Sequence, residues 1–292
     1  MPLWLLDLAV HWQWVATLWL ALATGVATLT ADRRWSLALL TLPLPWLTAA
    51  PQLPARAETA ALAFSVASAN VHDDNRDATA LRGWLAGARP DLVVLLEVTP
   101  GYAAGLAALA DDYPYREIAA AEGPSGIALL SRRPLTAVRV HRDGPDLGRI
   151  DARVTLEGRE LAVSAVHLWP PVSVHARLER DRTLAALVRV IDAGGRPGLV
   201  IGDLNATPWS TAFVVPDARG WRRASDLTPS WPDGGALALG IPIDHVLASP
   251  GWTRVEADTG PPIGSDHRPV LVRLALSPPP GAAGASLALP VR

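Results

Sequence analysis

The sequence of 292 residues contains no cysteine and no lysine. The lack of cysteine excludes disulfide bonds, thiolate catalysis and cysteine metal sites, and a cysteine-free chain fits a reducing or an oxidising compartment. There is also no G-x-S-x-G stretch of the kind that carries the nucleophilic serine of many hydrolases. Any catalysis must therefore come from other polar side chains.

A strong net charge is missing as well. The formal net charge is −2 and the sequence pI is about 6.4, which gives no global basic field for nucleic acid, although local patches remain possible. Half of the residues are hydrophobic, and six of the twelve tryptophans fall within the first fifty residues. The length and this uneven distribution fit a membrane segment beside one sizeable domain.

The first long apolar run extends from Leu8 to Thr30, 23 residues without a formal charge. At about 1.5 Å per residue, a helix of this length crosses a hydrocarbon core of roughly 30 Å. Trp4, Trp12 and Trp14 lie near one end, where interfacial aromatic residues are expected. We predict a transmembrane helix here.

A second apolar run, from Trp35 to Ala50, has 16 residues and contains two prolines. Extended to Leu53 it can span with a kink, so residues 1–53 are predicted to form a membrane segment of two hydrophobic helices. The alternative is a secretory signal, with Arg33 and Arg34 as its charged region and small residues at 55–57 as its cleavage site. The complete hydrophobic span that comes first favours the two-helix interpretation.

The arginines between the two runs predict the orientation of the chain. Residues 1–7 contain no basic residue, so the positive-inside bias of Arg33 and Arg34 places their loop in the cytoplasm. The N-terminus and everything after residue 53 are then extracytoplasmic. Residues 54–61 are typical of a linker, residues 62–276 of a folded domain and residues 277–292 of a disordered tail.

Short apolar runs alternate with helical patterns in the region after residue 60, which predicts an α/β fold. Several of the runs are continuous in Val, Leu, Ile and Ala, which indicates strands that are buried on both faces. Helices are expected at about 77–88, 101–111 and 173–193, the last with Ser173 as its N-cap. The expected strands are ALAFSVASAN, DLVVLLEV, GIALLSR, DARVTLEG, ELAVSAVHL, GLVIGDLN, IDHVLAS and PVLVRLAL.

Polar residues stand at the ends or starts of these strands. The carboxyl end of one strand and the start of an antiparallel neighbour share an edge of a sheet, so these side chains can converge on one rim. Each has a structural alternative: a turn residue, an Asx turn in GDLN, or a histidine satisfied in the core. A carboxylate that closes LVVLL, however, must be paired or metal-bound to offset desolvation. The set is Asn70, Glu97, His167, Asp203, Asn205, Asp244, His245, Asp266 and His267.

This inventory of carboxylates, amides and imidazoles suits one reaction class. Oxygen ligands favour Mg²⁺, Mn²⁺ or Ca²⁺ over zinc, and such ions commonly bind phosphate oxygens. A carboxylate can orient or deprotonate the attacking water, while a protonated imidazole stabilises charge on the phosphoryl oxygens. In SDHRPV, Asp266 would keep His267 oriented, charged or close to a metal. We therefore expect phosphoester hydrolysis with Mg²⁺ or Mn²⁺.

The ordered stretches SANVHDDN, VVLLEV, SGIALLSRRPL, VHLWPP, VIGDLNATPWS, IDHVLAS and GSDHRPV resemble the endonuclease/exonuclease/phosphatase superfamily over roughly residues 62 to 274. The chain most resembles the bacterial membrane-anchored members. The resemblance implies a four-layer sandwich of two mixed β-sheets flanked by helices. Leucine stands in GDLN where an aromatic residue is more usual.

The resemblance also implies roles for single residues. Asn70, Glu97 and Asp266 would lie on the metal side, and Glu97 would be the principal ligand. The catalytic residues would be His167 on the scissile phosphate, Asp203 on the water, Asn205 on phosphate oxygens, Asp244 orienting one of the histidines, and His267 as the terminal imidazole beside Asp266.

The substrate remains open between nucleic acid, a phospholipid headgroup and a small phosphodiester. The near-neutral pI and the membrane segment oppose tight DNA binding, whereas Trp169, Trp209, Trp221 and Trp231 can stack on bases or enter a membrane interface. No obligate protein partner is evident. The alternatives are a catalytically silent binding domain on the same fold, which a missing ligand would favour, or a membrane protein whose helices do the work and whose domain is regulatory.

Overall fold

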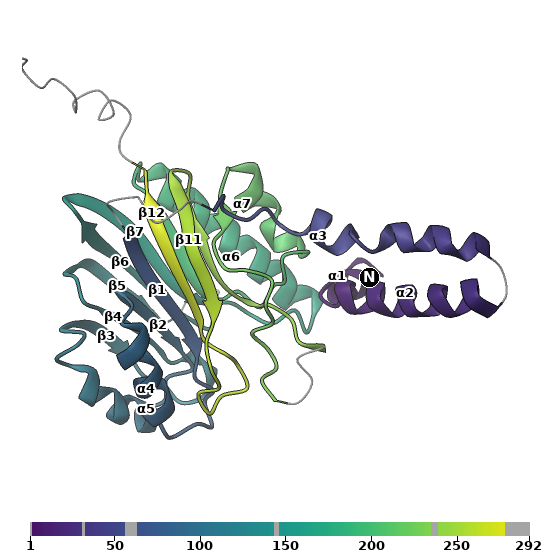
Figure 1. Cartoon of the computed structure of the whole chain (residues 1–292). Helices are drawn as coiled ribbons and strands as arrows, with labels where there is room; N and C mark the ends of the chain where they lie inside the picture. Colours follow the sequence, from purple (N-terminus) through teal and green to yellow (C-terminus); the bar gives the residue numbers. More distant parts are fainter. Residues whose placement is uncertain (1, 31–32, 56–62, 143–145, 235–238, 278–292) are drawn as a thin grey trace, which may run out of the picture.

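The computed structural model describes residues 2–30, 33–55, 63–142, 146–234 and 239–277. Two six-stranded mixed sheets face each other, helices cover their outer faces, and a helical hairpin extends from one side of the domain (Figure 1). The predicted α/β sandwich of two mixed β-sheets is thus confirmed.

The first sheet has the strand order β11-β12-β1-β2-β4-β3. Its central strands β1 and β2 are parallel, and the other neighbours are antiparallel. The strands are β1 (Ala63–Asn70), β2 (Leu92–Leu96), β3 (Tyr115–Ala119), β4 (Ile127–Ser131), β11 (Trp252–Thr259) and β12 (Val270–Leu276).

The second sheet has the order β5-β6-β7-β8-β10-β9 and repeats this pattern, with β7 and β8 as its central parallel pair. Its strands are β5 (Leu135–His141), β6 (Gly148–Leu156), β7 (Arg159–His167), β8 (Gly198–Asp203), β9 (Arg222–Arg223) and β10 (Asp244–Ala248).

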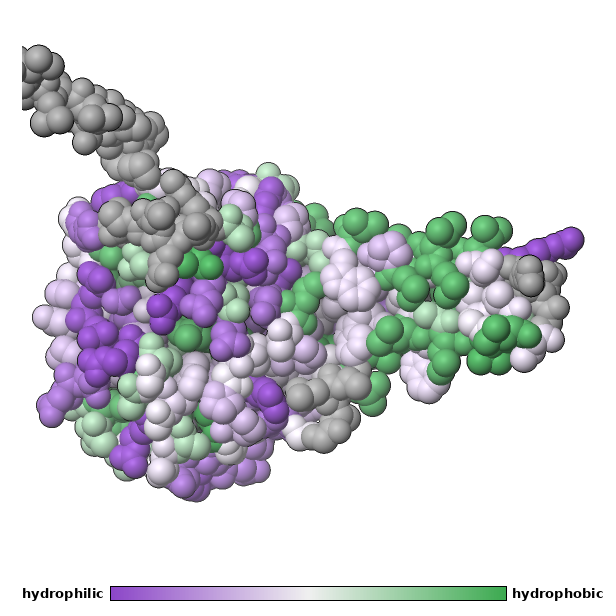
Figure 2. Space-filling view, in the orientation of Figure 1, coloured by the Kyte–Doolittle hydropathy of each residue, from purple (hydrophilic) through white to green (hydrophobic). Residues whose placement is uncertain are grey.

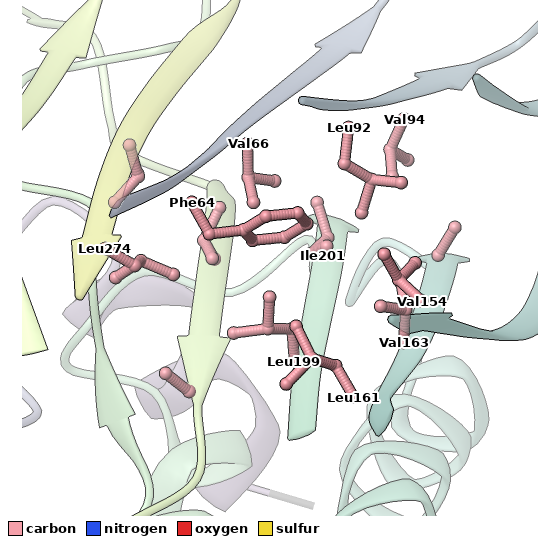
Figure 3. Packing of buried hydrophobic residues seen from close by; sticks show 14 of the residues in the cluster. Phe64, Val66, Leu92, Val94, Val154, Leu161, Val163, Leu199, Ile201 and Leu274 are labelled. Atoms are coloured by element: carbon pink, nitrogen blue, oxygen red, sulfur yellow. The ribbon is translucent and has the colours of Figure 1, made fainter. Parts of the chain in front are cut away.

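The main core lies between the sheets. Phe64 and Val66 of β1 point toward the second sheet, where Leu199 and Ile201 of β8 meet them (Figure 3). Neighbouring residues such as Ala67 face the opposite way, into the core beneath the helices. Burial on both faces explains why the strand sequences are continuous apolar runs rather than alternations.

Helices cover the outer faces of both sheets. On the first sheet lie α4 (Thr79–Ala88), α5 (Pro100–Gly105) and the 3₁₀ helix η2 (Leu106–Leu109). A further 3₁₀ helix, η3 (Gly123–Ser125), has no buried residue. On the second lie α6 (Val174–Ala193), η4 (Thr211–Phe213) and α7 (Val214–Ala218). The N-cap prediction for α6 is confirmed, because Ser173 Oγ accepts a hydrogen bond from Ala176 N at 3.1 Å.

All eight predicted strands are present, but four further strands, β3, β5, β9 and β11, were not predicted. These are the four edge strands of the two sheets. Each edge strand has one neighbour and is largely half-buried or exposed, so its sequence lacks the apolar run that marks a central strand. Helix α7, only five residues long, was also missed.

The N-terminal segment differs from its prediction. The single helix expected from Leu8 to Thr30 is divided at His11 and Trp12 into α1 (Pro2–Val10) and α2 (Gln13–Thr30). The reason is that Asp7 and His11 are buried against the domain, which holds α1 away from the axis of α2. By length and composition, α2 is the one described helix that can cross a membrane.

The second apolar run forms η1 (Arg33–Thr41) and α3 (Leu44–Thr48), which return alongside α2 (Figure 1). The prediction of a second spanning helix is not supported by helix length, since α3 has only five residues. A 3₁₀ helix rises about 2.0 Å per residue, so η1 extends further than an α-helix of equal length.

The predicted boundaries fall partly outside the described residues. The described residues do not include 56–61 of the linker, 56–57 of the alternative cleavage site, 62 at the start of the domain, or 278–292 of the tail. Pro54 belongs to the described part of the linker, and its carbonyl oxygen accepts a hydrogen bond from Arg254 N at 3.1 Å.

Candidate active site

Strand topology brings the predicted polar residues to one rim. The parallel strands β1 and β2 end there with Asn70 and, one residue beyond β2, Glu97; the parallel strands β7 and β8 end there with His167 and Asp203. The antiparallel register of β10 pairs its first residue, Asp244, with Asp203. Asn205 follows β8, and Asp266 and His267 precede β12, which is antiparallel to β1.

The buried carboxylate of Asp203 is at the centre of this rim. Its Oδ2 lies 3.6 Å from His167 Nε2 and 3.8 Å from His267 Nε2. Asn70 Nδ2 is 3.5 Å from the same oxygen and donates to Glu97 Oε1 at 2.8 Å. Residues from both sheets thus meet around one carboxylate oxygen.

The acid that pairs with His267 is not its neighbour in sequence. Asp244 Oδ2 lies 2.8 Å from His267 Nδ1, whereas the Asp266 carboxylate accepts a hydrogen bond from Trp231 Nε1 at 2.9 Å. Of the three roles predicted for Asp266, orienting the imidazole is filled by Asp244 instead, and the role of Asp266 beside a metal stays a prediction. The histidine that Asp244 orients, which the sequence left open, is His267.

Charge and burial oppose each other at these groups. Burial alone would lower the pKa of His267, but the charge of Asp244 and its hydrogen bond outweigh burial and raise that pKa to about 10. Burial and the nearby charge of Asp244 raise the pKa of Asp203 to about 8. The positive charge of His267 overcomes burial and holds the pKa of Asp244 below its ordinary value. The opposite charges of Asp244 and His267 therefore stabilise each other, whereas burial favours the protonated form of Asp203 in the metal-free protein.

His167 and Asn205 form the opposite wall. Burial lowers the pKa of His167, whose Nδ1 lies 3.1 Å from the carbonyl of Pro124. That contact fixes Nδ1 as the protonated nitrogen of a neutral ring and leaves Nε2 facing Glu97 and Asp203. Asn205 Nδ2 lies 3.4 Å from the same Nε2 and donates to the carbonyl of Leu168 at 2.9 Å.

Backbone conformation at the rim is unusual. Glu97 has φ 61°, Asn205 has φ 47° and His72 has φ 65°, all in the left-handed region that non-glycine residues rarely adopt. At Gly202, beside Asp203, φ is 144° and an added Cβ would lie 2.0 Å from Val166 O. Glycine there allows β7 and β8 to approach closely where His167 and Asp203 leave them.

Sequence reasoning missed His72. Its Nδ1 lies 3.6 Å from Glu97 Oε2 and 3.7 Å from Asp266 Oδ1, so it stands between two predicted metal ligands. The sequence offered only a weak signal, a histidine two residues beyond Asn70. Together with the amide oxygen of Asn70, these groups are a donor set that fits Mg²⁺ or Mn²⁺.

Among the described residues, two acid–histidine groups have ligand atoms within 4.8 Å of one another. One is His72, Asp73 and Asp74; the other is the buried set of Asp203, Asp244 and His267. In the buried set, His267 Nδ1 is already bonded to Asp244 Oδ2 at 2.8 Å. We therefore interpret that set as a coupled acid–base group, and the predicted metal ligands remain Asn70, Glu97 and Asp266.

His245, also noted at a strand start, belongs to the core. Its Nδ1 lies 2.8 Å from Ser225 Oγ and its Nε2 2.9 Å from the carbonyl of Ala206, and its ring packs edge-on against Phe213. Burial lowers its pKa to about 3, so the ring is neutral.

A cavity of about 440 Å³ opens over the rim. Of the predicted site residues, Glu97, His167, Asp203, Asn205 and His267 line it. The rest of its wall is mainly apolar and includes His11, whose place here the sequence did not indicate. The further lining residues are Pro124, Leu147, Trp169, Pro170, Pro171, Val172, Trp231, Ile241 and Ile243.

Comparison with known proteins agrees with this geometry. Among solved structures, humanized D. rerio TDP2 has a TM-score of 0.61 at 19% identity and covers 73% of this chain and 98% of that chain. An endonuclease/exonuclease/phosphatase from Beutenbergia cavernae DSM 12333 has a TM-score of 0.58 at 20% identity, covering 74% of this chain and 72% of that one. Sphingomyelinase C from Streptomyces griseocarneus has a TM-score of 0.53 at 18% identity, covering 73% and 99%. At these identities the likeness shows the fold.

No curated protein is similar enough in sequence to count as a relative. The sequence does match the Endonuclease/Exonuclease/phosphatase family over residues 64–267, which include all eight predicted site residues. Because this match covers most of its length, the chain belongs to the Endonuclease/Exonuclease/phosphatase family, a family of phosphoester hydrolases.

Proposed function

We propose that this protein is a membrane-anchored, divalent-metal-dependent phosphodiesterase. The observation that carries the proposal is the position of Asp203 Oδ2, within 3.8 Å of the Nε2 atoms of both His167 and His267, at the floor of a cavity. A water molecule beside that carboxylate and a phosphoryl group beside the two rings are the arrangement that phosphoester hydrolysis requires.

Glu97, Asp266 and Asn70 are the residues that would hold Mg²⁺ or Mn²⁺, with His72 adjacent. The side chain of Glu97 is 14% exposed and that of Asp266 45%, so solvent reaches both carboxylates, and Glu97 lines the cavity. When bound, such an ion neutralises negative charge on the phosphoryl oxygens. The amide nitrogen of Asn70 donates to Glu97 Oε1 at 2.8 Å, and its oxygen accepts a hydrogen bond from His72 N at 3.0 Å.

The remaining residues act on water and phosphate. Ionised Asp203 orients the attacking water and accepts its proton. The water oxygen joins phosphorus, one P–O ester bond breaks, and the leaving oxygen takes up a proton, giving a phosphomonoester and an alcohol. His267, held by Asp244, supplies positive charge to the phosphoryl oxygens, while His167 and Asn205 bind them from the opposite wall.

The hairpin of α2 with the returning η1 and α3 is proposed as the anchor, with the domain on the extracytoplasmic side. The start of the hairpin (Asp7, His11) and its end (Ala50, Leu53) both contact the domain, so both lie on one side of the membrane. The end of α2 and the start of η1, which contains Arg33 and Arg34, are at the far tip (Figure 1), where the positive-inside bias places these arginines in the cytoplasm.

The test is hydrolysis of bis(p-nitrophenyl) phosphate by the full chain in detergent. We expect turnover that EDTA abolishes and that Mg²⁺ or Mn²⁺ restores, and a loss of about 10²- to 10⁴-fold in Asp203→Ala. Glu97→Gln should weaken metal binding measured directly by calorimetry. Turnover that is unaffected by EDTA in the wild type would exclude the metal role, and full activity of a folded Asp203→Ala would exclude the proposed base.

A further inference from the structure

The hairpin is joined to the domain beside the active site. The carboxylate of Asp7 in α1 lies 3.1 Å from Arg180 Nη2 of α6 and accepts a hydrogen bond from Thr211 Oγ1 at 3.1 Å. The side chains of Asp7 and Arg180 are 3% and 0% exposed. A buried ion pair requires close packing around it, so α1 is a fixed part of the domain.

Further contacts of the hairpin reach the loop that follows Asn205. His11 Nδ1 lies 3.0 Å from Thr207 Oγ1 and accepts a hydrogen bond from Thr207 N at 3.2 Å. At the other end of the hairpin, Ala50 N donates to Pro208 O at 2.6 Å, and Trp209 Nε1 donates to Pro45 O. Both ends of the hairpin are therefore held at residues 205–209, and His11 itself lines the cavity.

Beyond this junction the hairpin has an apolar surface. Trp19 is 64% exposed, Leu29 87% and Leu40 74%, and the space-filling view shows hydrophobic residues along the projecting part (Figure 2). Tryptophans gather where the hairpin meets the domain: Trp14, Trp46 and Trp209 line one small cavity there. This arrangement places the membrane interface at the junction.

The cavity rim on this side is also apolar. Trp169 is 40% exposed and Val172 71%, both in the loop between His167 and α6. Leu239 is 50% exposed, and its carbonyl accepts a hydrogen bond from Trp12 Nε1 at 3.1 Å, which fixes it beside the junction. Apolar side chains therefore continue from the hairpin to the mouth of the active site.

We infer that the substrate is a phosphodiester lipid of the same membrane, whose headgroup enters the cavity while its hydrocarbon chains stay in the bilayer. This inference rests on the proposed function. The apolar rim contacts the lipid next to the headgroup, and the phosphate reaches His167, Asp203 and His267. Water supplies the hydroxyl that ends on phosphorus and the proton that ends on the leaving alcohol.

Nucleic acid is the competing substrate, and the residues that line the cavity do not favour its binding. A polyanion is bound through several arginines or lysines along its backbone. Among the described residues that line this cavity, none is an arginine, and the chain has no lysine. Apart from His11 and the five site residues, the wall is made of proline, tryptophan and aliphatic side chains.

The experiment uses the full chain reconstituted with Mg²⁺ in vesicles of phosphatidylcholine, phosphatidylethanolamine, phosphatidylglycerol and sphingomyelin. Phosphorus-31 NMR follows loss of the phosphodiester, and parallel assays contain plasmid DNA or bis(p-nitrophenyl) phosphate. We expect EDTA-sensitive loss of at least one lipid, faster than cleavage of DNA phosphodiesters. Hydrolysis of the soluble diester with every lipid intact, or faster cleavage of DNA, would overturn the lipid inference alone. No hydrolysis of any substrate would overturn the proposed function.

Two valines of equal exposure provide a matched pair of variants. Val172, at the rim, is 71% exposed, and Val190, near the end of α6, is 72% exposed. Val172→Asp should lower the ratio of lipid to soluble-diester turnover by about tenfold, because a carboxylate at the rim opposes entry into the interface. Val190→Asp should leave this ratio within about twofold, as expected for a surface substitution away from the site. Equal ratios in the two variants would contradict the proposed role of the rim.

Discussion

Asp203 combines a catalytic position with a burial that opposes its ionised form. Its pKa of about 8 lies above the ordinary value of 3.8, so the folded state binds this proton more tightly than the unfolded state. The contribution of Asp203 to stability is therefore greatest at low pH and declines as the pH rises from about 4 to about 8.

Replacing Asp203 by Asn removes this titration and the proposed catalytic base together. We expect Asp203→Asn to lower turnover by about 10²- to 10⁴-fold. In metal-free buffer its melting temperature, relative to the wild type, should be higher at pH 8.5 than at pH 5. Thermal unfolding at the two pH values measures this difference, and a difference of the opposite sign would show that the folded state favours ionised Asp203.

Asp244 should control the charge of His267. The folded-state pKa of His267, about 10, exceeds its ordinary 6.5, so protonation of this ring stabilises the fold fully below about pH 6.5 and ceases to do so as the pH rises through about 10. In Asp244→Asn, the ring should be neutral at pH 8 and turnover there should fall by about 10²- to 10³-fold.

The control for this change is Asp266→Asn. Asp266 makes the smallest of the contributions that raise the pKa of His267, and its carboxylate hydrogen-bonds Trp231 instead. NMR titration of the His267 Cε1 proton should show a large fall in pKa for Asp244→Asn and a smaller one for Asp266→Asn. A larger fall of the His267 pKa in the Asp266 variant would show that Asp266, the neighbour in sequence, is the acid that pairs with His267.

At the residue scale, the sequence was sufficient to bring Asn70, Glu97, His167 and Asp203 to one rim, because each closes a strand. It was not sufficient to pair Asp244 with His267, which are 23 positions apart and belong to segments whose rotation is set by packing. His72 and His11 enter the site from a turn and from a helix break, and neither position follows from a strand pattern.

At the scale of elements, burial decides what can be predicted. Strands β1, β2, β7 and β8 are covered on both faces and appear in the sequence as apolar runs. The edge strands β3, β5, β9 and β11 lack such runs, because half of their surroundings is solvent. The break between α1 and α2 was missed because Asp7 and His11 bind the domain, and no local pattern records those contacts.

Docking of α1 can be tested through Asp7. Asp7→Ala leaves Arg180 buried with Asp181 as its remaining acidic partner, and we expect a loss of about 3 kcal/mol, the low end for breaking a buried pair. Thermal unfolding of the full chain in detergent measures the change. Glu179→Ala is the control, since it breaks the partly exposed pair with Arg182 on the same helix and should cost at most about 1 kcal/mol. Equal melting temperatures would show that α1 does not stabilise the domain.

On the scale of the whole molecule, the sequence suggested a membrane segment, a linker and an independent domain. The structure instead packs the start and end of the hairpin against the catalytic domain through Asp7, His11, Ala50 and Leu53. Such packing depends on contacts between residues about 170 to 200 positions apart, which no local pattern records. In the sequence, only the polar residues at the start of the apolar segment, which are buried in the structure, indicated this packing.

This double attachment affects how the enzyme would encounter substrate. A domain on a free tether samples a volume, whereas one fixed at both ends of its anchor keeps its cavity at a constant height above the leaflet. Encounter then becomes a problem of lateral diffusion in two dimensions. The rate would follow the mole fraction of substrate in the leaflet: diluting the vesicles with buffer would leave it unchanged, and diluting the substrate with inert lipid would lower it.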